Sequence, residues 1–545
     1  MDVAQYAMEL VSIPSVSSVS NERISRVIAD HLRRMGFEVE WLTYKDANGE
    51  RKVNLIAKRG EGSGGVAYLS HSDVVPADDW SLDFCGAFRP IIQDERLWGR
   101  GSCDMKGSIA CALAAIERIS ISEQTSPIYF ICTADEELGT MGARQVDTDS
   151  KFFAEMVEQE VFGIVGEPTE LGVVHAHKGG VGITVSARGK SAHSSLAIGI
   201  NANYTLIPIL PLLLEIQKES ESSLQYRSDT FNPPTLSWNM ILRNVPEAIN
   251  VTPSLAQACI FLRPMPHVDH QPLVDRVQRA AEALGLEFDY VDKTPPFWVP
   301  KDASCVRFME TITGDTDAHT VCYATDGGVL RRLKNLVVCG PGSIDQAHRN
   351  NEWISLEQLH RGVDVYERAF REWDSWKATG KISDRPSLPS VRTSTEPSSN
   401  WQLEVRAASD DDLMEVQSFL QTFVNQNKVL RRSRAELGTL LANGFIATVE
   451  NKMVGFCAIE IYSRKLGEIQ CLAVDERYQG RGIGTALVQK CVERGREKGI
   501  LEIMAISSSE GFLRKLGFDY SLPDQKRALF CQLRSREEMY THAEE

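Results

Sequence analysis

The stretch IYFICTADEELGTMGA (residues 128–143) decides the fold and raises the first functional question. Its apolar beginning has the composition of a buried strand, and it ends in three consecutive carboxylates, Asp135, Glu136 and Glu137. Neighbouring like charges repel one another, most strongly beside a segment that excludes water. We therefore expect a cation or a reactive centre next to these carboxylates.

Strands of the same kind recur on both sides of this stretch. GVAYLS (65–70) and FGIVGEP (162–168) are short, apolar and followed by polar residues, glycine or proline, while DMKGSIACALAAIERIS (104–120) has the pattern of a helix. Strands that alternate with crossover helices predict an α/β domain. Between about residues 179 and 292 the pattern changes, and strand-like segments surround two helical stretches, which predicts a small α+β insert.

The chain of 545 residues is too long for a single core, and its composition indicates where it divides. GKISDRPSLPSVRTSTEPSSN (380–400) is mostly Ser, Thr and Pro and reads as a linker. We predict the following domains: a catalytic domain of residues 1–178 and 293–378, an inserted domain of 179–292, a linker of 379–400, and a second α/β domain of 401–545.

Composition narrows the class of function. The net charge of −15 disfavours binding to nucleic acid or to an anionic membrane surface. We see no secretory signal in the first residues, and no apolar stretch approaches the ~20 residues that a membrane helix needs. The 12 cysteines are scattered without a C-x-x-C pair, which favours reduced thiols in the cytoplasm over disulfides or a thiolate zinc site.

Metal-ligating residue types follow the predicted strands. In open α/β sheets ligands collect at the carboxyl ends of the strands, so these side chains are expected to converge. Two histidines and several carboxylates suit zinc or a similar cation. These candidates are His71 and Asp73 in YLSHSDVVP, Asp104 in GRGSCDMKG, Glu136 and Glu137 in the opening stretch, Glu167 in GIVGEPTE and His348 in GPGSIDQAHRNNEW.

The set is large enough for two cations that share a bridging carboxylate about 3.5–4 Å from each other. Asp104 is the natural bridge, with His71 and Glu167 on one cation and Glu137 and His348 on the other. Glu136, which points differently from its neighbour, would be the general base and later the acid toward a leaving nitrogen. Asp73 would orient His71 through its other ring nitrogen.

These motifs, together with GKSAHSS…GINA, resemble the deacetylase, desuccinylase and carboxypeptidase family of co-catalytic metallopeptidases over roughly residues 5–375. GEPTELGVVHAHKG, FLRPMP and CGPGSIDQAHRNNEW are most similar to its members that deacetylate N2-acetylornithine. The resemblance implies an aminopeptidase-like catalytic domain interrupted by a dimerisation domain, hence a homodimer, with two zinc or cobalt ions and with Asp73 and Glu136 as active-site acids.

The resemblance also assigns roles within the insert. His193 in GKSAHSS matches a histidine that reaches the substrate carbonyl oxygen, often across a dimer interface, where a developing oxyanion needs a donor. Asn250 in AINVTP and Arg263 in LRPMP match positions that hold a substrate carboxylate, a task for which the arginine fork is suited. The alternative for His193 and Arg263 is a purely structural role. For Arg263 this role would be an ion pair at the edge of a sheet.

After the linker, CLAVDERYQGRGIGTALVQKCVERGREKG (471–499) predicts a strand, a glycine turn and a helix. Successive backbone N–H groups at a helix start form a phosphate nest. With LGF (516–518), this segment resembles the GNAT acetyltransferases over about residues 402–534, which implies acetyl-CoA on the turn. The cofactor-binding residues would be Gln479, Gly480, Arg481, Gly482, Ile483 and Gly484.

KVLRRSRAEL, GEIQCLAVDERYQGRGIG and LPDQKRALFCQLRS resemble, more finely, the acetyltransferase domain of N-acetylglutamate synthases. Glu468 would then be the base for the substrate amine, and Arg431 and Arg432 could meet a dicarboxylate. The chain departs from those synthases, which tend to have Tyr-Asn at Phe530-Cys531, and Leu513 replaces the tyrosine acid common elsewhere in the superfamily.

Together the resemblances imply a bifunctional enzyme of arginine biosynthesis that acts on small molecules: it deacetylates N2-acetylornithine and acetylates glutamate. Two alternatives remain open. The hydrolase could act on a succinylated diamino acid or a dipeptide, and the GNAT domain could acetylate another amine or serve as an acetyl-CoA sensor.

Overall fold

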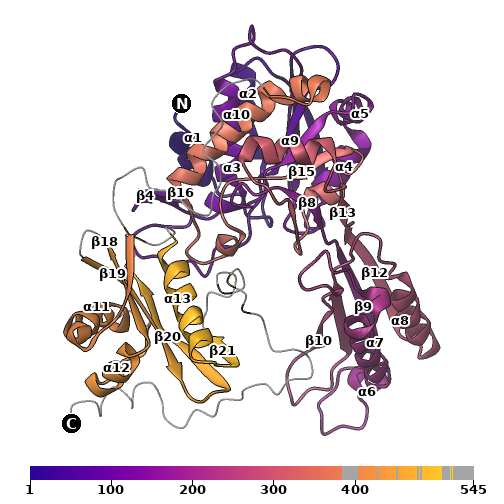
Figure 1. The fold of residues 1–545 in the computed structure, drawn as a ribbon. Helices are drawn as coiled ribbons and strands as arrows, with labels where there is room; N and C mark the ends of the chain where they lie inside the picture. Colours follow the sequence, from indigo (N-terminus) through magenta and orange to yellow (C-terminus); the bar gives the residue numbers. More distant parts are fainter. Residues whose placement is uncertain are drawn as a thin grey trace. The chain divides into compact units, whose positions relative to one another are not determined.

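The computed structural model describes residues 1–382, 403–425, 429–449, 452–475, 478, 482–505, 513, 516 and 518. Contacts between residues divide the chain into two units, Met1–Val391 and Arg392–Glu545. Both units mix helices and strands, so the predicted α/β class is confirmed (Figure 1). The predicted linker lies almost wholly outside the described residues, and its bounds stay a prediction.

The N-terminal unit is built on a nine-stranded sheet whose central strands are the three apolar segments of the sequence. β3 (Val66–His71) lies between β6 (Ile128–Thr133) and β7 (Phe162–Val165), parallel to both, and every residue of the three is buried. The order is β1-β2-β6-β3-β7-β15-β8-β13, with β14 paired to β8. The other strands are β1 (Glu38–Lys45), β2 (Arg51–Arg59), β8 (Val174–His177), β13 (Phe297–Trp298), β14 (His319–Val321) and β15 (Asn335–Val338).

Helices cover both faces of this sheet, which is why its central strands are apolar without alternation. On one face the Tyr68 hydroxyl donates to Ser108 Oγ (2.8 Å) in α3 (Gly107–Glu117), and that oxygen contacts the hydroxyl of Tyr366 (2.8 Å) in α10 (Leu356–Thr379). On the other, the Tyr129 hydroxyl donates to Glu155 (2.9 Å) in α5 (Lys151–Glu158). The remaining helices of this layered domain are α1 (Val3–Val11), α2 (Glu22–Arg34), α4 (Met141–Asp149) and α9 (Ser304–Thr313) (Figure 1).

Parallel strands bring their carboxyl ends to one edge of the sheet, and β3, β6 and β7 end there at His71, Thr133 and Val165. A small three-stranded sheet, in the order β16-β5-β4, brings distant segments of the chain together. Its strands are β4 (Ile91–Gln93), β5 (Arg96–Trp98) and β16 (Trp353–Ser355), with Trp353 opposite Trp98. The helical turn η1 (Ser102–Lys106) follows β5 and leads into α3.

A second sheet with its own core lies between β8 and β13 in the sequence. This four-stranded antiparallel sheet has the order β10-β11-β9-β12, and helices pack on it around a separate apolar core (Figure 1). The elements are β9 (Gly180–Arg188), α6 (Ala202–Leu206), α7 (Leu210–Ser222), β10 (Asn239–Val245), β11 (Leu255–Leu262), α8 (Gln271–Ala283) and β12 (Glu287–Thr294).

The C-terminal unit has, in its described part, a five-stranded sheet ordered β17-β18-β19-β20-β21. Only the last pair, β20 with β21, is parallel. Two apolar cores lie on opposite faces of the sheet, one under α11 and α12 and one under α13. The elements are β17 (Leu403–Ala407), α11 (Leu413–Asn425), α12 (Arg434–Leu441), β18 (Gly444–Val449), β19 (Lys452–Ile461), β20 (Leu466–Val474), α13 (Ile483–Glu497) and β21 (Glu502–Ala505).

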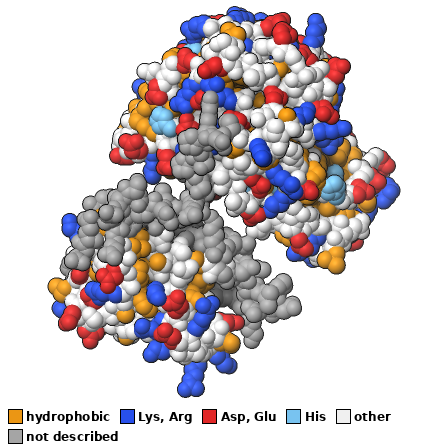
Figure 2. Space-filling model, turned by 45° about the horizontal axis from the view of Figure 1, so that its top comes forward, with side chains coloured by type: hydrophobic (Ala, Val, Ile, Leu, Met, Phe, Trp, Pro, Cys, Tyr) orange, Lys and Arg blue, Asp and Glu red, His pale blue; other side chains and the backbone are white. Residues whose placement is uncertain are grey.

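The surface carries charges of both signs. Acidic and basic side chains are interspersed over the described residues on the face shown in Figure 2. Among the described residues, every helix is too short or too polar to cross a membrane.

We predict that Phe162→Ala lowers the free energy of unfolding of the N-terminal unit by about 3–5 kcal/mol. The ring is fully buried, stacks on Trp373 at 4.5 Å and meets Phe308 edge-on at 5.5 Å, so truncation leaves a cavity. Urea denaturation measures the change. Ile121→Ala is the control, since this side chain is 69% exposed and should change stability by less than about 0.5 kcal/mol. Equal effects of the two substitutions would contradict the packing described here.

Candidate metal centre

The five predicted metal ligands lie together at the carboxyl edge of the large sheet. His71 Nε2 is 3.1 Å from Asp104 Oδ1 and 3.6 Å from Glu167 Oε1. His348 Nε2 is 3.4 Å from Asp104 Oδ2 and 3.0 Å from Glu137 Oε2. Asp104 therefore presents one carboxylate oxygen to each imidazole.

These separations fit cation ligands. Donors about 2.0–2.2 Å from a tetrahedral zinc ion lie roughly 3.3–3.6 Å from one another. Ligand atoms of His71, Asp104 and Glu137 lie within 4.8 Å of one another, and so do those of His71, Glu136 and Glu167. Buried carboxylates gather this closely only where positive charge compensates them, so the donor set and its spacing fit divalent cations.

The pKa shifts within the cluster also indicate a site for cations. Burial and the neighbouring acids raise the pKa of Glu136 and Glu167 well above the usual range. Burial opposes protonation of His71, but the surrounding carboxylates outweigh it and raise its pKa. Hydrogen bonds to Asp104 and Glu137 raise the pKa of His348 to about 10. Without a cation, these side chains therefore tend to stay protonated. A bound cation would displace their protons.

The three consecutive carboxylates turn out to have different partners. Asp135, in a left-handed conformation (φ 57°), pairs with the buried ammonium of Lys52 (2.8 Å) and accepts a hydrogen bond from the Tyr44 hydroxyl (2.7 Å). Glu136 and Glu137 belong to the cluster. The sequence analysis did not identify Lys52, because the strand RKVNLIAKR carries several basic residues and nothing in the sequence distinguishes the buried one.

Asp73 fixes the turn that carries the two glutamates. Its carboxylate accepts the backbone N–H groups of Glu136 (3.2 Å) and Glu137 (3.3 Å) and the hydroxyl of Ser17 (2.7 Å). The nearer acceptor for His71 Nδ1 is the backbone carbonyl of Asp73 (2.9 Å), whereas the carboxylate is 3.6 Å away. Residue 73 therefore contacts His71 mainly through its main chain.

Two buried acids near the cluster had no assigned role in the sequence analysis. Glu352 accepts hydrogen bonds from the segment that carries Asp104, and burial raises its pKa to about 7. Asp326 accepts a hydrogen bond from the Thr133 hydroxyl (2.5 Å), and burial raises its pKa to about 7 as well. Glu352 belongs to the motif GPGSIDQAHRNNEW, but its spacing from the proposed ligands did not indicate a role for it.

The insert places its three candidates in two groups. His193 and Asn250 are exposed neighbours: Ser194 N–H donates to the Asn250 carbonyl (3.0 Å), and the His193 ring contacts Ser195 Oγ (2.7 Å). Arg263 is half-buried beside the Phe261 ring (4.9 Å), and its charge interacts with that of Glu136. Burial has the larger effect on the pKa of Arg263 and lowers it, but of the three candidates Arg263 is the one whose pKa the charge of Glu136 also affects.

The C-terminal unit places Glu468 on β20, where it is 7% exposed and accepts a hydrogen bond from the Tyr462 hydroxyl (2.5 Å). Gly482 has φ 78° and caps α13, which begins with Ile483 and Gly484. Leu513 is buried. The predictions on Gln479, Gly480, Arg481, Phe530 and Cys531 lie outside the described residues.

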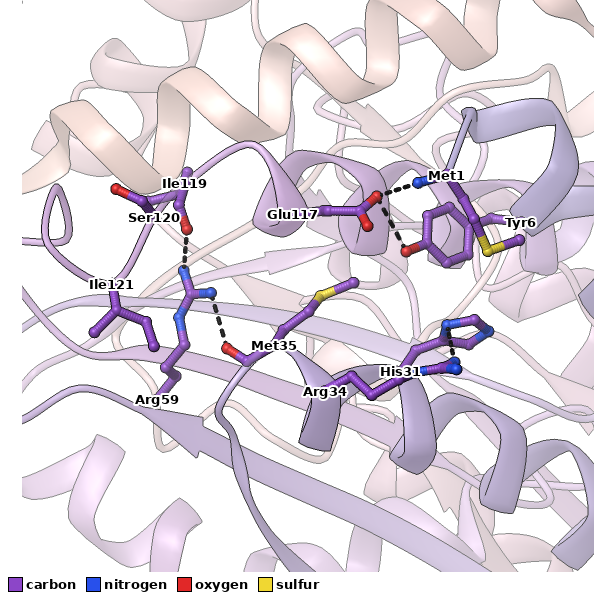
Figure 3. Close-up of a pocket in the computed structure, with 10 residues that line it drawn as sticks. All are labelled: Met1, Tyr6, His31, Arg34, Met35, Arg59, Glu117, Ile119, Ser120 and Ile121. Carbon is purple, nitrogen blue, oxygen red and sulfur yellow. Dashed lines mark hydrogen bonds and ion pairs between the residues drawn. The ribbon is translucent and has the colours of Figure 1, made fainter.

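A separate cavity of about 480 Å³ lies in the N-terminal unit, next to the sheet end at which Arg59 closes β2, and its charged groups are paired with one another or with the main chain (Figure 3). Glu117 binds the Met1 ammonium (2.5 Å) and the Tyr6 hydroxyl (3.2 Å), while Arg59 donates to the carbonyls of Met35 and Ile119. This cavity does not include the carboxylate cluster.

Comparisons with known proteins agree with this geometry. The sequence model of peptidase family M20/M25/M40 matches residues 67–372, and that of the acetyltransferase (GNAT) family matches residues 413–518. The chain is 30% identical over 376 residues to an acetylornithine deacetylase of Vibrio campbellii, covering 66% of this chain and 95% of that protein. It is 31% identical over 364 residues to one of Photorhabdus laumondii, covering 64% and 91%.

Solved structures share the fold at lower sequence identity. A dipeptidase from Saccharomyces cerevisiae superposes with a TM-score of 0.55 at 14% identity, covering 68% of this chain and 95% of that one. An M20 family metallo-carboxypeptidase from Sulfolobus solfataricus gives 0.53 at 16% identity, covering 67% and 98%.

The resemblances stated from the sequence are therefore confirmed at the level of the two families. Acid and imidazole side chains at successive strand ends, with matches over most of the N-terminal unit, place the chain in the metal-dependent peptidase family M20/M25/M40, joined to a GNAT acetyltransferase domain.

Proposed function

We propose that the N-terminal unit hydrolyses N2-acetylornithine to ornithine and acetate, and that the C-terminal unit acetylates glutamate from acetyl-CoA, both in arginine biosynthesis in the cytoplasm. Relatives called acetylornithine deacetylase, about 30% identical over nearly their whole length, support the substrate. The observation that carries the hydrolase is Asp104, whose two oxygens face two different imidazoles beside Glu136.

Two zinc or cobalt ions would occupy the centre, one on His71 and Glu167 and one on Glu137 and His348, with Asp104 shared. Bound cations would polarise the acetamide carbonyl and acidify a nearby water molecule. Glu136 is the chain's own contribution to proton transfer: it takes a proton from the attacking water and delivers it to the departing amine. Asp73 keeps Glu136 in place through the backbone N–H of residue 136.

His193 and Asn250 would complete a neighbouring subunit's site in a homodimer formed by the insert. Two features support this arrangement. The pair is exposed on the insert, and β10 is an edge strand with an exposed apolar surface. Exposed apolar side chains at this edge and around α6 and α7 are Leu196, Ile198, Ile200, Tyr204, Ile207, Leu214, Ile241, Leu242, Val245 and Ile249. Many exposed apolar side chains on one small domain favour an interface there.

The acetyltransferase proposal is supported by polar side chains on the α11/α12 face of the sheet. Glu460 and Glu468 are directly opposite each other on β19 and β20, and Tyr462 donates to Glu468 (2.5 Å). Arg432 donates to Gln470 (2.7 Å), two residues further along β20. Glu468 would accept the proton of the substrate amine, Arg432 would bind its carboxylate, and the start of α13 would hold the pyrophosphate of acetyl-CoA.

The substrate of the hydrolase is tested by steady-state rates on a panel of N-acyl amino acids. We expect kcat/KM for N2-acetylornithine to exceed that for succinyl-diaminopimelate and for dipeptides by at least tenfold. A panel without preference for acetylornithine would contradict the proposed substrate and favour the alternatives. Glu136→Gln should lower kcat by about 10²–10⁴-fold while cation content, measured by elemental analysis, is retained.

The shared site is tested by mixing two inactive variants. His193→Ala and Glu136→Gln should each be inactive alone, yet hybrid dimers contain one site with both residues intact. Activity should therefore return after subunit exchange, up to about a quarter of the wild-type rate at equal mixing. Mixtures that stay inactive, although co-purification of two differently tagged variants shows hybrid dimers, would place His193 in its own subunit's site or outside catalysis.

The acetyl acceptor is tested by two neighbouring arginines that the structure distinguishes. Arg432 contacts β20, whereas Arg431 is exposed. Arg432→Ala should raise the KM for glutamate about tenfold or more and leave acetyl-CoA affinity unchanged, while Arg431→Ala should change neither. Wild-type protein that binds acetyl-CoA calorimetrically but transfers no acetyl group to glutamate would instead favour the sensor alternative.

A further inference from the structure

The buried carboxylate of Glu352 gathers four donors from one short segment. Its Oε1 accepts the backbone N–H groups of Cys103 (2.8 Å) and Asp104 (3.1 Å). Its Oε2 accepts the backbone N–H of Gly101 (2.9 Å) and the Arg100 guanidinium (3.0 Å). The side chain is 1% exposed, so these contacts exclude water.

Glu352 stands four residues after His348, and its contacts join the two segments that carry cation ligands. Its own carbonyl accepts the Gly99 N–H (3.1 Å), and Arg100 also donates to the carbonyl of Arg349 (2.8 Å). Next to these contacts, strand β5 pairs with strand β16 and joins the same two segments of the chain. Glu352 thus lies at the centre of the contacts that join residues 99–104 to residues 349–355, through both its side chain and its backbone.

The ligands that depend on this junction are those that the large sheet does not hold. His71 is the last residue of β3, and Glu167 follows β7 by two residues, so the core fixes both. Asp104 lies in a turn with non-helical backbone angles, and His348 is 54% exposed with φ 62°. Neither Asp104 nor His348 lies in a strand or a regular helix, so each needs an external restraint to keep its geometry.

We propose that Glu352 is a positioning residue that sets the distance between the bridging carboxylate of Asp104 and the imidazole of His348, and thereby retains the second of two cations. This inference rests on the two-cation centre of the proposed function. Without Glu352, the cation on His71 and Glu167 keeps these two ligands, because the sheet holds them. The cation on Glu137 and His348 is weakened, because the distance between Asp104 and His348 is no longer fixed.

The substitution Glu352→Gln tests this role with little change in volume. A glutamine amide offers one acceptor oxygen, so its NH₂ group must face two of the four donors in either orientation. Leaving buried donors unpaired weakens the junction, and changes in groups that orient metal ligands typically cost about 10–100-fold in affinity.

The experiment is equilibrium dialysis of the full-length, chelator-treated protein against Co²⁺, with bound cobalt measured by elemental analysis and by its visible absorption. Wild type should bind two ions per chain. Glu352→Gln should weaken the second ion at least tenfold, like His348→Ala, and the first ion less than the second, because that ion keeps His71 and Glu167 besides the shared Asp104. The variant with both Glu352→Gln and His348→Ala should lose no more affinity for the second ion than His348→Ala alone, because both changes act on that cation.

The matched control is Glu357→Gln, an exposed glutamate five residues further along, which should bind both ions with wild-type affinity. Near-ultraviolet circular dichroism checks the fold, and Glu352→Asp, which is too short to span all four donors, replaces the glutamine variant if that one does not fold. Two ions bound to the Glu352 variant within twofold of wild-type affinity would overturn the inference. Fewer than two on wild type would instead contradict the two-cation centre itself.

Discussion

The repulsion among buried carboxylates at one edge of a parallel sheet is the constraint on which the N-terminal unit depends. Glu136, Glu137, Glu167 and Asp104 converge there with two imidazoles, and burial makes their negative charge costly. Divalent cations remove that cost and turn the crowded edge into a reaction centre. The surrounding contacts can be understood as the means of keeping these groups together.

Three kinds of support hold the centre, and each uses a different part of the chain. The sheet fixes His71 and Glu167 through strands buried on both faces. Asp73 accepts two backbone N–H groups of the glutamate turn, and Lys52 neutralises Asp135, the one carboxylate of the triplet that faces away from the cluster. The segments that carry Asp104 and His348, which have no regular structure at those residues, meet at Glu352.

Sequence reasoning could propose ligands that the structure brings together because their chemistry is local. A histidine or acid directly after an apolar strand has a predictable place at the sheet edge, and the motifs around His71, Asp104 and Glu167 follow that rule. Lys52, Asp326 and Glu352 were not found, since a residue that neutralises or orients another is identified by its contact. In this protein those contacts join positions far apart, such as Lys52 with Asp135 and Glu352 with Asp104.

The sequence by itself determined the α/β class, the insert-like change of pattern, and the two families, because strand hydrophobicity, helix periodicity and ligand motifs are properties of short segments. Tertiary structure alone decided which oxygen of Asp104 faces which imidazole, that Asp73 contacts His71 through its carbonyl, and that the segments of His193 and Asn250 lie together on the insert while Arg263 lies beside Phe261. The reason is geometric: distances between side chains on different segments depend on how those segments pack, which no local pattern encodes.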